Sequence, residues 1–482
     1  MRFSTLEDAQ KKKSFNKKRW VSMLISIILG IIIWFIPVPG NFSVSAWHLF
    51  AIFVATAFGF MLRPFPSGVV TLIALTMTMV TGILQVPEAF EGFSSDTIWL
   101  IVSAFLFSRG LIKTGLGRRI AYFLMARFGS SSLKLSYSLS LGDLIISAFV
   151  PSNTARSGGI MYPIVRSIAG VAGSEPDKEP RKIGAYLIMS LVHNDNIASG
   201  LTMTACAGNL LVVTFAAKIA NIHLSWFSWF LMASVPALVA FIATPWILYK
   251  IFPPTMKKTP EARIAAQQAL SEMGKMSSEE KLLSLIFAIT IIGWATTGIT
   301  GLSSTVVALV GLSLMTLTGI LKWQDITTEK GAWDVMFWMG GMYSLADNLS
   351  KMNFFKIFAQ YVARDLHGIS WPLGLAILIF IFIATTYGFA SGISHLLAMY
   401  PVFLTVAIGI GVPPFLAVMS LGICTVLYQT LTHYASGPAA VYFGGGYVEQ
   451  GTWWRLGIEM LLMNFVIWGF VGFTWWKILG LW

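Results

Sequence analysis

Long apolar runs alternate with short polar segments along most of the chain. Stretches such as "WVSMLISIILGIIIWFIPVP" (20–39) and "GVVTLIALTMTMVTGILQV" (68–86) are each long enough to cross the roughly 30 Å hydrocarbon core of a bilayer as a helix. The pattern predicts an all-α integral membrane protein with about eleven transmembrane helices. The longest polar insert, about residues 253–281, is too short to form a soluble domain of its own.

Composition and charge agree with this class of protein. Hydrophobic residues make up 56% of the chain and charged residues only 11%, which excludes a water-soluble globule. The basic runs "KKK" and "KKR" precede the first apolar run, so the positive-inside rule predicts a cytoplasmic N-terminus. The net charge of +12 therefore reflects membrane topology, and no nucleic-acid partner is expected. We expect a multi-pass protein of a bacterial inner (plasma) membrane, in contact with the lipid bilayer.

The chain also repeats itself. Segments 67–84 and 304–321 share nine of eighteen residues at a shift of 237, and "MYPIV" (161–165) matches "MYPVF" (399–403) at a shift of 238. The same register places Lys113 opposite Lys351. One register held over about a hundred residues indicates two homologous halves, which is typical of secondary transporters. A duplicated structural scaffold or an anion channel remains an alternative at this point.

The repeat divides the chain into five parts. Residues 1–19 form a basic N-terminal segment, 20–45 the first transmembrane helix, 46–250 the first repeat, 251–282 a polar connector and 283–482 the second repeat. In each repeat we expect an amphipathic arm helix, "GLGRRIAYFLMARF" in the first and "NFFKIFAQYVARDL" in the second, lying along the membrane interface.

Each half contains two polar interruptions within its apolar runs. They read "PSNTARSGG" (151–159) and "HNDNIASGLTMTACAGN" (193–209) in the first half, and "FASGISHLLAMYP" (389–401) and "YQTLTHYASGPAAVYFGGG" (428–446) in the second. Non-helical backbone is tolerated at membrane depth only where it lines a wet cavity or a ligand, because its N–H and C=O groups need partners. We therefore expect the four interruptions to meet at one site, with the first of each pair at the tip of a re-entrant helical hairpin.

The first interruption has the chemistry of an anion site. Ser152, Asn153 and Thr154 are good N-caps for the helix that follows, whose free N–H groups and dipole favour an anion. Arg156 adds formal charge, and an arginine at membrane depth needs a partner or a cavity. A guanidinium also binds a carboxylate in a bidentate fork.

The second half supplies the counterparts of these residues. The 238 shift places Ser391 opposite Asn153, Ser394 opposite Arg156 and His395 opposite Ser157. One basic residue per hairpin suggests one carboxylate of the substrate per hairpin.

In the second pair of interruptions, the shift shortens to 230 and places Thr432 opposite Thr202 and Ser436 opposite Cys206. Here Cys206, Asn209, Thr432, Ser436, Gly437 and Pro438 are expected to close the site.

Other polar residues have simpler explanations. "HNDN" (193–196) resembles a metal or proton site, but two possible ligands do not make a coordination shell, so neither metal nor cofactor is expected. His433 is either a neighbour of the ligand or a structural histidine. Cys206 near His193 is the only faint sign of an enzyme, and no phosphate-binding G-x-x-x-x-G-K-[ST] loop occurs, so we predict that the protein is not an enzyme and is not driven by ATP.

The motif "SNT" at a hairpin tip in a duplicated bundle resembles the divalent anion/sodium symporter (DASS, INDY-type) family, over nearly the whole chain. "PSNTARSGGIMYPI", "FASGISHLLAMY" and "THYASGP" resemble its exchanger branch, which includes 2-oxoglutarate/malate translocators and citrate/succinate antiporters. The resemblance implies inverted repeats, a homodimer, and an elevator in which a transport domain slides along a scaffold domain. In the symporter branch of the family that this chain resembles, both hairpin tips carry Ser-Asn-Thr and bind sodium. This chain lacks that motif around 391–395.

These observations predict sodium-independent exchange of dicarboxylates such as 2-oxoglutarate, malate or succinate. Sodium-coupled symport of di- or tricarboxylates is the main alternative, and an anion channel is a more remote one. The predicted substrate site comprises Ser152, Asn153, Thr154, Arg156, Cys206, Asn209, Ser391, Ser394, His395, Thr432, Ser436, Gly437 and Pro438.

Overall fold

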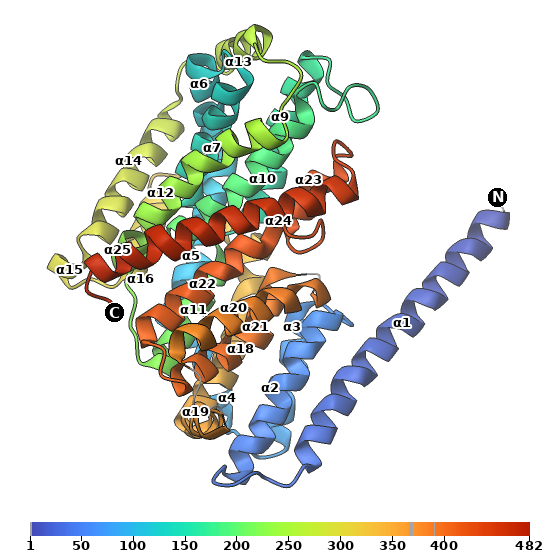
Figure 1. The fold of residues 1–482 in the computed structure, drawn as a ribbon, viewed down its shortest axis with the longest axis vertical. Coiled ribbons are helices and arrows are strands. Elements are labelled where there is room, and N and C mark those ends of the chain that lie inside the picture. Colours follow the sequence, from blue (N-terminus) through green and yellow to red (C-terminus); the bar gives the residue numbers. More distant parts are fainter. Residues whose placement is uncertain (1, 366–369, 390) are drawn as a thin grey trace.

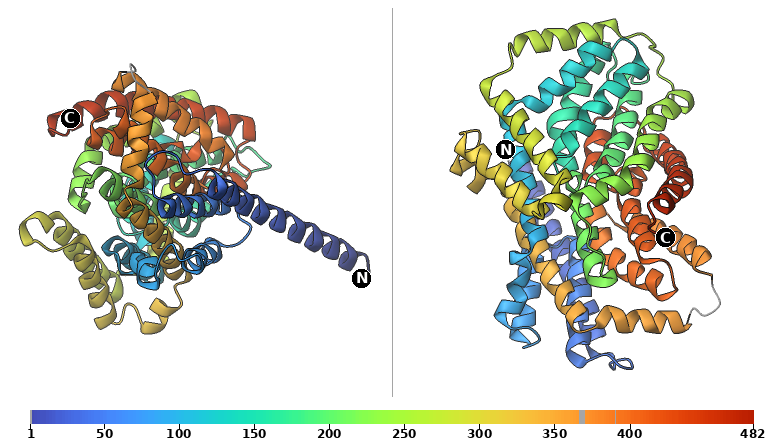
Figure 2. Two further views of the ribbon diagram at one scale, coloured as in Figure 1. Left: turned by 90° about the horizontal axis from the view of Figure 1, so that it is seen from below. Right: turned by 90° about the vertical axis from the view of Figure 1, so that its left-hand side faces the viewer.

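The computed structural model describes residues 2–365, 370–389 and 391–482, with side chains for residues 19–361, 370–389 and 391–482. Within these ranges every regular element is a helix, apart from isolated β-bridges (Figures 1 and 2). Except for Arg19, the side chains of the basic N-terminal runs lie outside the described residues, as do Ala390 and the end of the second predicted arm helix.

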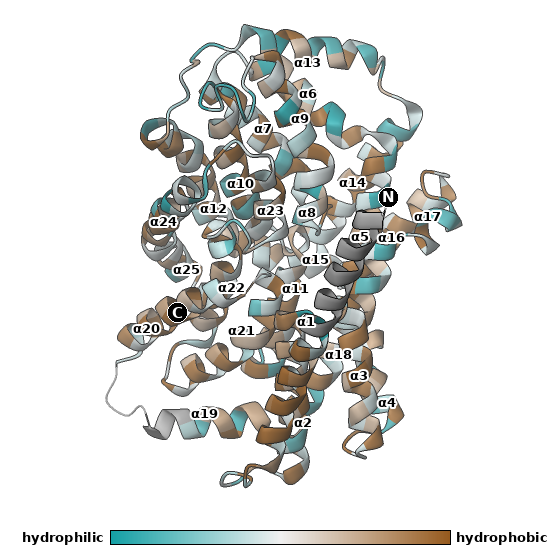
Figure 3. Ribbon diagram, turned by 90° about the vertical axis from the view of Figure 1, so that its right-hand side faces the viewer, coloured by the Kyte–Doolittle hydropathy of each residue, from teal (hydrophilic) through white to brown (hydrophobic). Residues whose placement is uncertain are grey.

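Six helices among the described residues are long and apolar enough to cross a membrane, and five further apolar helical segments are shorter. The sequence predicted about eleven full spans. Two of the shorter segments, Ala207–Ala220 and Pro414–Thr430, are short because they adjoin polar interruptions, and Arg19–Phe35 is the described part of a longer helix. Large apolar side chains cover the outside: Val80 is 75% exposed and Leu317 83% exposed, as expected for surfaces that face lipid. Hydrophobic residues dominate the described part of α1 and neighbouring helices α2 and α3 (Figure 3).

The first half begins with helices that run up to the first hairpin. Gly115, at φ 77°, lets one helix follow another without a longer loop, because this left-handed conformation suits glycine. The elements are α1 (Arg2–Phe35), α2 (Val44–Leu62), α3 (Ser67–Val80), α4 (Val86–Phe90), η1 (Glu91–Ser94), α5 (Asp96–Thr114) and α6 (Leu116–Phe128).

Two helical hairpins contain the first interruption of each half. Hairpin 1 consists of α7 (Ser132–Ser147), α8 (Asn153–Arg156), the π-helical turn η2 (Ser157–Met161) and α9 (Tyr162–Val171). Hairpin 2 consists of α20 (Trp371–Ala384), η4 (Thr385–Gly388) and α21 (Gly392–Gly409). In Figure 1 hairpin 1 lies in the upper part of the molecule and hairpin 2 in the lower part.

Two broken helices contain the second interruption of each half. The first runs through α10 (Gly184–Leu201), η3 (Met203–Ala205) and α11 (Ala207–Ala220). The second runs through α22 (Pro414–Leu427), η5 (Tyr428–Thr430) and α23 (Gly437–Gly444). Together with the hairpins they surround the middle of the molecule.

The remaining helices connect the halves and complete the second one. They are α12 (Trp226–Ile251), α13 (Pro260–Glu272), α14 (Ser278–Ala295), α15 (Thr297–Thr300), α16 (Ser304–Leu317), α17 (Trp323–Thr327), α18 (Lys330–Lys351), α19 (Phe354–Asp365), α24 (Gln450–Ile467), η6 (Trp468–Gly472) and α25 (Phe473–Ile478). The amphipathic helices α6 and α19 lie at opposite ends of the molecule (Figure 1).

The two lysines that the repeat aligns form reciprocal ion pairs between the halves. Lys113 of the first half lies 2.6 Å from Asp325 of the second, and Lys351 of the second lies 2.5 Å from Glu91 of the first. Each half therefore supplies the cation for an acid of the other.

Arg119 on α6 ties the arm helix to the connector. Its Nε lies 2.7 Å from the buried Glu280 carboxylate, and its other nitrogens donate to the carbonyl oxygens of Gly274 and Met273. Glu280 also accepts the backbone N–H of Ser277, which completes a capping box at the start of α14.

We expect Glu280→Gln to lower the free energy of unfolding at pH 7 by about 1–3 kcal/mol, because Arg119 loses its ionised partner. Burial favours the neutral acid, but hydrogen bonds from Arg119 and Ser277 outweigh it and hold the pKa of Glu280 below its usual value. The stabilisation is therefore present above the pKa of an unfolded glutamate, about 4.3, and is lost as the pH falls through the lower folded value.

Thermal unfolding in detergent checks this. The wild type and Glu280→Gln should differ at pH 7 and converge in acid, while Glu272→Gln, at an exposed site on α13, should match the wild type throughout. If the difference in stability between the wild type and Glu280→Gln did not change with pH, the ionised carboxylate of Glu280 would not be its cause.

Candidate functional site

The four interruptions meet, as their pairing predicted. Asn153 of hairpin 1 donates through Nδ2 to Oε1 of Gln429 in the second broken helix, at 3.0 Å. The backbone N–H of Ala207 donates to the Pro151 carbonyl at 3.1 Å, which joins the first broken helix to the same tip. A Cβ added to Gly437 would lie 1.9 Å from the Thr154 hydroxyl, so this glycine permits a close approach of two interruptions.

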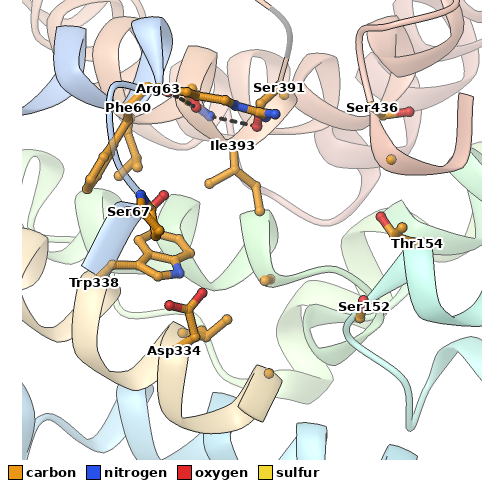
Figure 4. Close-up of a pocket in the computed structure, with 18 of the residues that line it drawn as sticks. Phe60, Arg63, Ser67, Ser152, Thr154, Asp334, Trp338, Ser391, Ile393 and Ser436 are labelled. Atoms are coloured by element: carbon orange, nitrogen blue, oxygen red, sulfur yellow. Dashed lines mark hydrogen bonds between the residues drawn. The ribbon is translucent and has the colours of Figure 1, made fainter. Parts of the chain in front are cut away.

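A cavity of about 860 Å³ opens at this meeting point (Figure 4). Four helices start there, and the N-cap residue of each lines the wall: Ser152 for α8, Cys206 for α11, Ser391 for α21 and Ser436 for α23. The short helix α8 continues through η2 into α9, so the helical backbone runs on from the tip. One cavity thus receives the positive dipole ends of four helical segments.

Serine hydroxyls order three of these helix starts. Ser152 accepts a hydrogen bond from the Ala155 N–H at 3.2 Å, Ser391 from that of Ser394 at 3.4 Å, and Ser436 from that of Ala439 at 3.2 Å. Each cap satisfies one N–H of the first turn and leaves others for a ligand.

The opposite wall comes from residues that sequence reasoning did not select. Arg63 follows α2, Ser67 begins α3, and Asp334 and Trp338 lie on α18, across the cavity from Ser152 and Thr154 (Figure 4). Gln429 also lines the cavity. Gln429 belongs to the interruption 428–446, whereas no sequence pattern shows that Arg63 or Asp334 faces the hairpins.

A second arginine stands at this wall. The Nε of Arg19 donates to the Pro64 carbonyl at 2.7 Å, and its guanidinium lies 4.2 Å from the centre of the Phe65 ring. The charged side chains that line the cavity among the described residues are Arg19, Arg63 and Asp334. They carry a net positive formal charge.

Arg156 lies elsewhere than expected. Its guanidinium is fully buried behind the hairpin 1 tip, 2.7 Å from both Asp143 on α7 and Asp195 on α10. It also donates to the carbonyl oxygens of Val150 and Ala205, and to Ser199. All three guanidinium nitrogens are engaged, so the structure corrects the expectation that this side chain reaches into the cavity.

His395 likewise lies behind its tip and does not line the cavity. Its Nδ1 lies 2.7 Å from the Tyr428 hydroxyl and its Nε2 lies 2.9 Å from that of Thr385. The rings of Phe382 and Phe389 pack around it. Both ring nitrogens therefore have protein partners in this structure.

The other predicted residues divide in the same way. Asn209 does not line the cavity. Its side-chain amide donates to the carbonyl oxygens of Ser199 and Thr202, at the break between α10 and α11. Thr432 is buried, and Pro438 lies in the first turn of α23. The predicted residues that line the cavity are Ser152, Asn153, Thr154, Cys206, Ser391, Ser394, Ser436 and Gly437.

This fold and site define a class of protein: a multi-pass helical membrane protein with a cavity between two hairpins and two broken helices. Comparison with known proteins places the chain in the same class. The family model described as "Sodium:sulfate symporter transmembrane region" matches residues 17–482. The chain therefore belongs to this family, the divalent anion/sodium symporters, and is a transporter and not an enzyme.

Relatives extend over almost the whole chain. YflS of Bacillus subtilis, whose name proposes it as a malate transporter, is 42% identical over 99% of each chain. Dicarboxylate transporter 1 of the Spinacia oleracea chloroplast is 38% identical over 95% of this chain and 81% of its own. The inner membrane protein YbhI of Escherichia coli is 36% identical over 97% of this chain and 99% of its own.

Solved structures share the fold at low identity. The Alcanivorax borkumensis YdaH transporter aligns with a TM-score of 0.52 at 12% identity, covering 84% of this chain and 89% of its own. Neisseria gonorrhoeae MtrF aligns with a TM-score of 0.50 at 12% identity, covering 94% and 93%. These two show the architecture alone.

Proposed function

We propose that this protein exchanges dicarboxylates, such as 2-oxoglutarate, malate or succinate, across a bacterial inner membrane without sodium. The observation that carries the proposal is the start of four helical segments at one cavity, each with its N-cap residue on the wall. The names of the Bacillus and spinach relatives support the substrate class, and that of the E. coli relative supports the membrane.

The cavity has the electrostatics that a dianion needs. A dicarboxylate carries about two negative charges at neutral pH, and removing them from water is costly without compensation. We place one carboxylate at the hairpin 1 tip, against Ser152 and Thr154, and the other at the hairpin 2 tip, against Ser391. Free N–H groups at both helix starts would bind the oxygens, and Arg63 lines the same cavity.

Fixed groups support independence from sodium. The guanidinium of Arg156 occupies the position behind the hairpin 1 tip and donates to the carbonyl oxygens of Val150 and Ala205. The guanidinium therefore takes the place of a bound cation, although it does not reach the substrate.

The same groups favour exchange over one-way transport. An empty cavity leaves the N–H groups of the four helix starts without an anion, so moving it through the membrane unloaded is unfavourable. We further propose a homodimer with inverted repeats and an elevator movement of the hairpins and broken helices. The reciprocal ion pairs of Lys113 and Lys351, and the positions of α6 and α19 at opposite ends, support inversion.

Counterflow in liposomes tests the proposal. Vesicles preloaded with succinate should take up labelled malate or 2-oxoglutarate equally well in sodium and in choline buffer, and unloaded vesicles should take up almost none. Uptake that needs an inward sodium gradient but no internal substrate would restore the symporter, and current proportional to voltage would indicate a channel.

Gln429→Leu is expected to weaken dicarboxylate binding about tenfold, because it removes a wall side chain and leaves Asn153 without its partner at the tip. Titration of purified protein with succinate measures the change. Gln267→Leu, at an exposed position on α13, is the matched control. Unchanged affinity for Gln429→Leu would separate this residue from the site.

A further inference from the structure

The ion cluster behind the hairpin 1 tip has two carboxylates for one cation. Asp143 and Asp195 each place one oxygen 2.7 Å from a nitrogen of Arg156, and all three side chains are at most 1% exposed. With both acids ionised, the cluster carries a net charge of −1 in a region without water access. Such a charge is expensive to bury unless another group compensates it.

No second cation in the described part of the chain performs this role. The ionisable groups that face the pair are Arg156 from α8, Cys206 at the start of α11 and Tyr442 from α23. A thiol and a phenol are neutral near pH 7. His193, also on α10, instead meets the Thr430 hydroxyl through Nδ1.

The remaining oxygens of the pair point to a missing proton. Oδ2 of Asp143 and Oδ2 of Asp195 are buried and have no hydrogen-bond donor, although the two carboxyl groups lie within hydrogen-bonding reach of each other. Beside them, the hydroxyls of Ser157 and Tyr442 are also buried and lie within hydrogen-bonding reach of each other. Two acceptors that face each other in a dry site become a favourable pair when one of them carries a proton.

We propose that Asp143 and Asp195 form a proton-binding site, in which one proton is shared between the two carboxyl groups and makes the cluster with Arg156 neutral. The site lies directly behind the cavity wall, since Arg156 bonds the carbonyls of Val150 and Ala205, and the next residues, Pro151 and Cys206, line the cavity. On the proposed function, neutrality matters because a net negative cluster here would repel an anionic substrate.

Infrared spectroscopy of the purified protein without substrate tests the site independently of transport. The C=O stretch of a protonated carboxylic acid is separate from carboxylate bands and shifts in D2O. We expect one such band in the wild type that is lost in both Asp143→Asn and Asp195→Asn, because the acid that remains is then ionised against Arg156. Asp325→Asn, at an exposed ion pair on α17, should leave the band unchanged.

Thermal unfolding supplies a second readout. Each single asparagine mimics a protonated acid and keeps the cluster neutral, so its unfolding temperature should stay within about 3 °C of the wild type. The double variant leaves Arg156 without a carboxylate and should unfold about 10 °C lower or fail to fold. A wild-type spectrum without the band, or single variants as unstable as the double, would overturn the proposal.

Discussion

Arg156→Met is expected to destabilise the folded protein by about 3–5 kcal/mol, because it leaves Asp143 and Asp195 buried without their cation. The substitution also removes the donors to the Val150 and Ala205 carbonyls, which fix the tip against the first broken helix. The measurement is thermal or denaturant unfolding in detergent, together with the yield of monodisperse protein.

A matched control comes from an exposed arginine. Arg455 forms only a 3.8 Å pair with Glu459 and is 59% exposed, so Arg455→Met should change stability by less than about 1 kcal/mol. If Arg156→Met were as stable as the control but bound dicarboxylates poorly, the guanidinium would act on the substrate and not on the fold.

Gly437→Ala is expected to reduce exchange at least tenfold. The added Cβ would lie 1.9 Å from Oγ1 and 2.8 Å from Cβ of Thr154, so the hairpin 1 tip and the start of α23 must separate. Overpacking of this kind costs about 1–3 kcal/mol, and here the shift would move two walls of the cavity. Initial rates of counterflow measure the effect.

Gly444→Ala tests whether the loss comes from this contact. Gly444 lies on the same helix, and a Cβ there would meet nothing within 4 Å. It should therefore exchange at the wild-type rate. Equal activity of the two variants would show that the close approach of Gly437 to Thr154 is not needed during transport.

The convergence of the four interruptions could be predicted from the sequence because the physics is local. Polar residues with proline and glycine inside apolar runs cannot stay in a lipid-facing helix, and the repeat showed that the interruptions are paired. Serines at these positions cap helices, and Ser152, Ser391 and Ser436 do so at the cavity.

The direction of the Arg156 side chain could not be predicted in this way, because it depends on which partner lies within reach. Asp143 stands in an apolar run before the first interruption, and Asp195 was considered only as part of "HNDN". One signal was present: Asp143 and Arg156 are equally distant from the tip of the hairpin, so its antiparallel arms bring them side by side. Asp195 comes from a separate helix, and only the fold brings it there.

The opposite wall was beyond sequence reasoning for a related reason. Arg63 follows α2, and Asp334 and Trp338 lie one helical turn apart on α18. These helices are far from the hairpins in the chain, and nothing in their local pattern distinguishes a side chain that faces a cavity from one at the membrane surface.

The central claim is that fixed groups of the protein, without an alkali metal, hold the doubly charged substrate. Calorimetric titration of purified protein with succinate or malate, first in sodium chloride and then in choline chloride of equal ionic strength, tests it most directly. We expect dissociation constants that agree within about twofold, since the helix starts and Arg63, which line the cavity, do not change with the salt. Binding that disappears in choline and returns with added sodium would contradict the account.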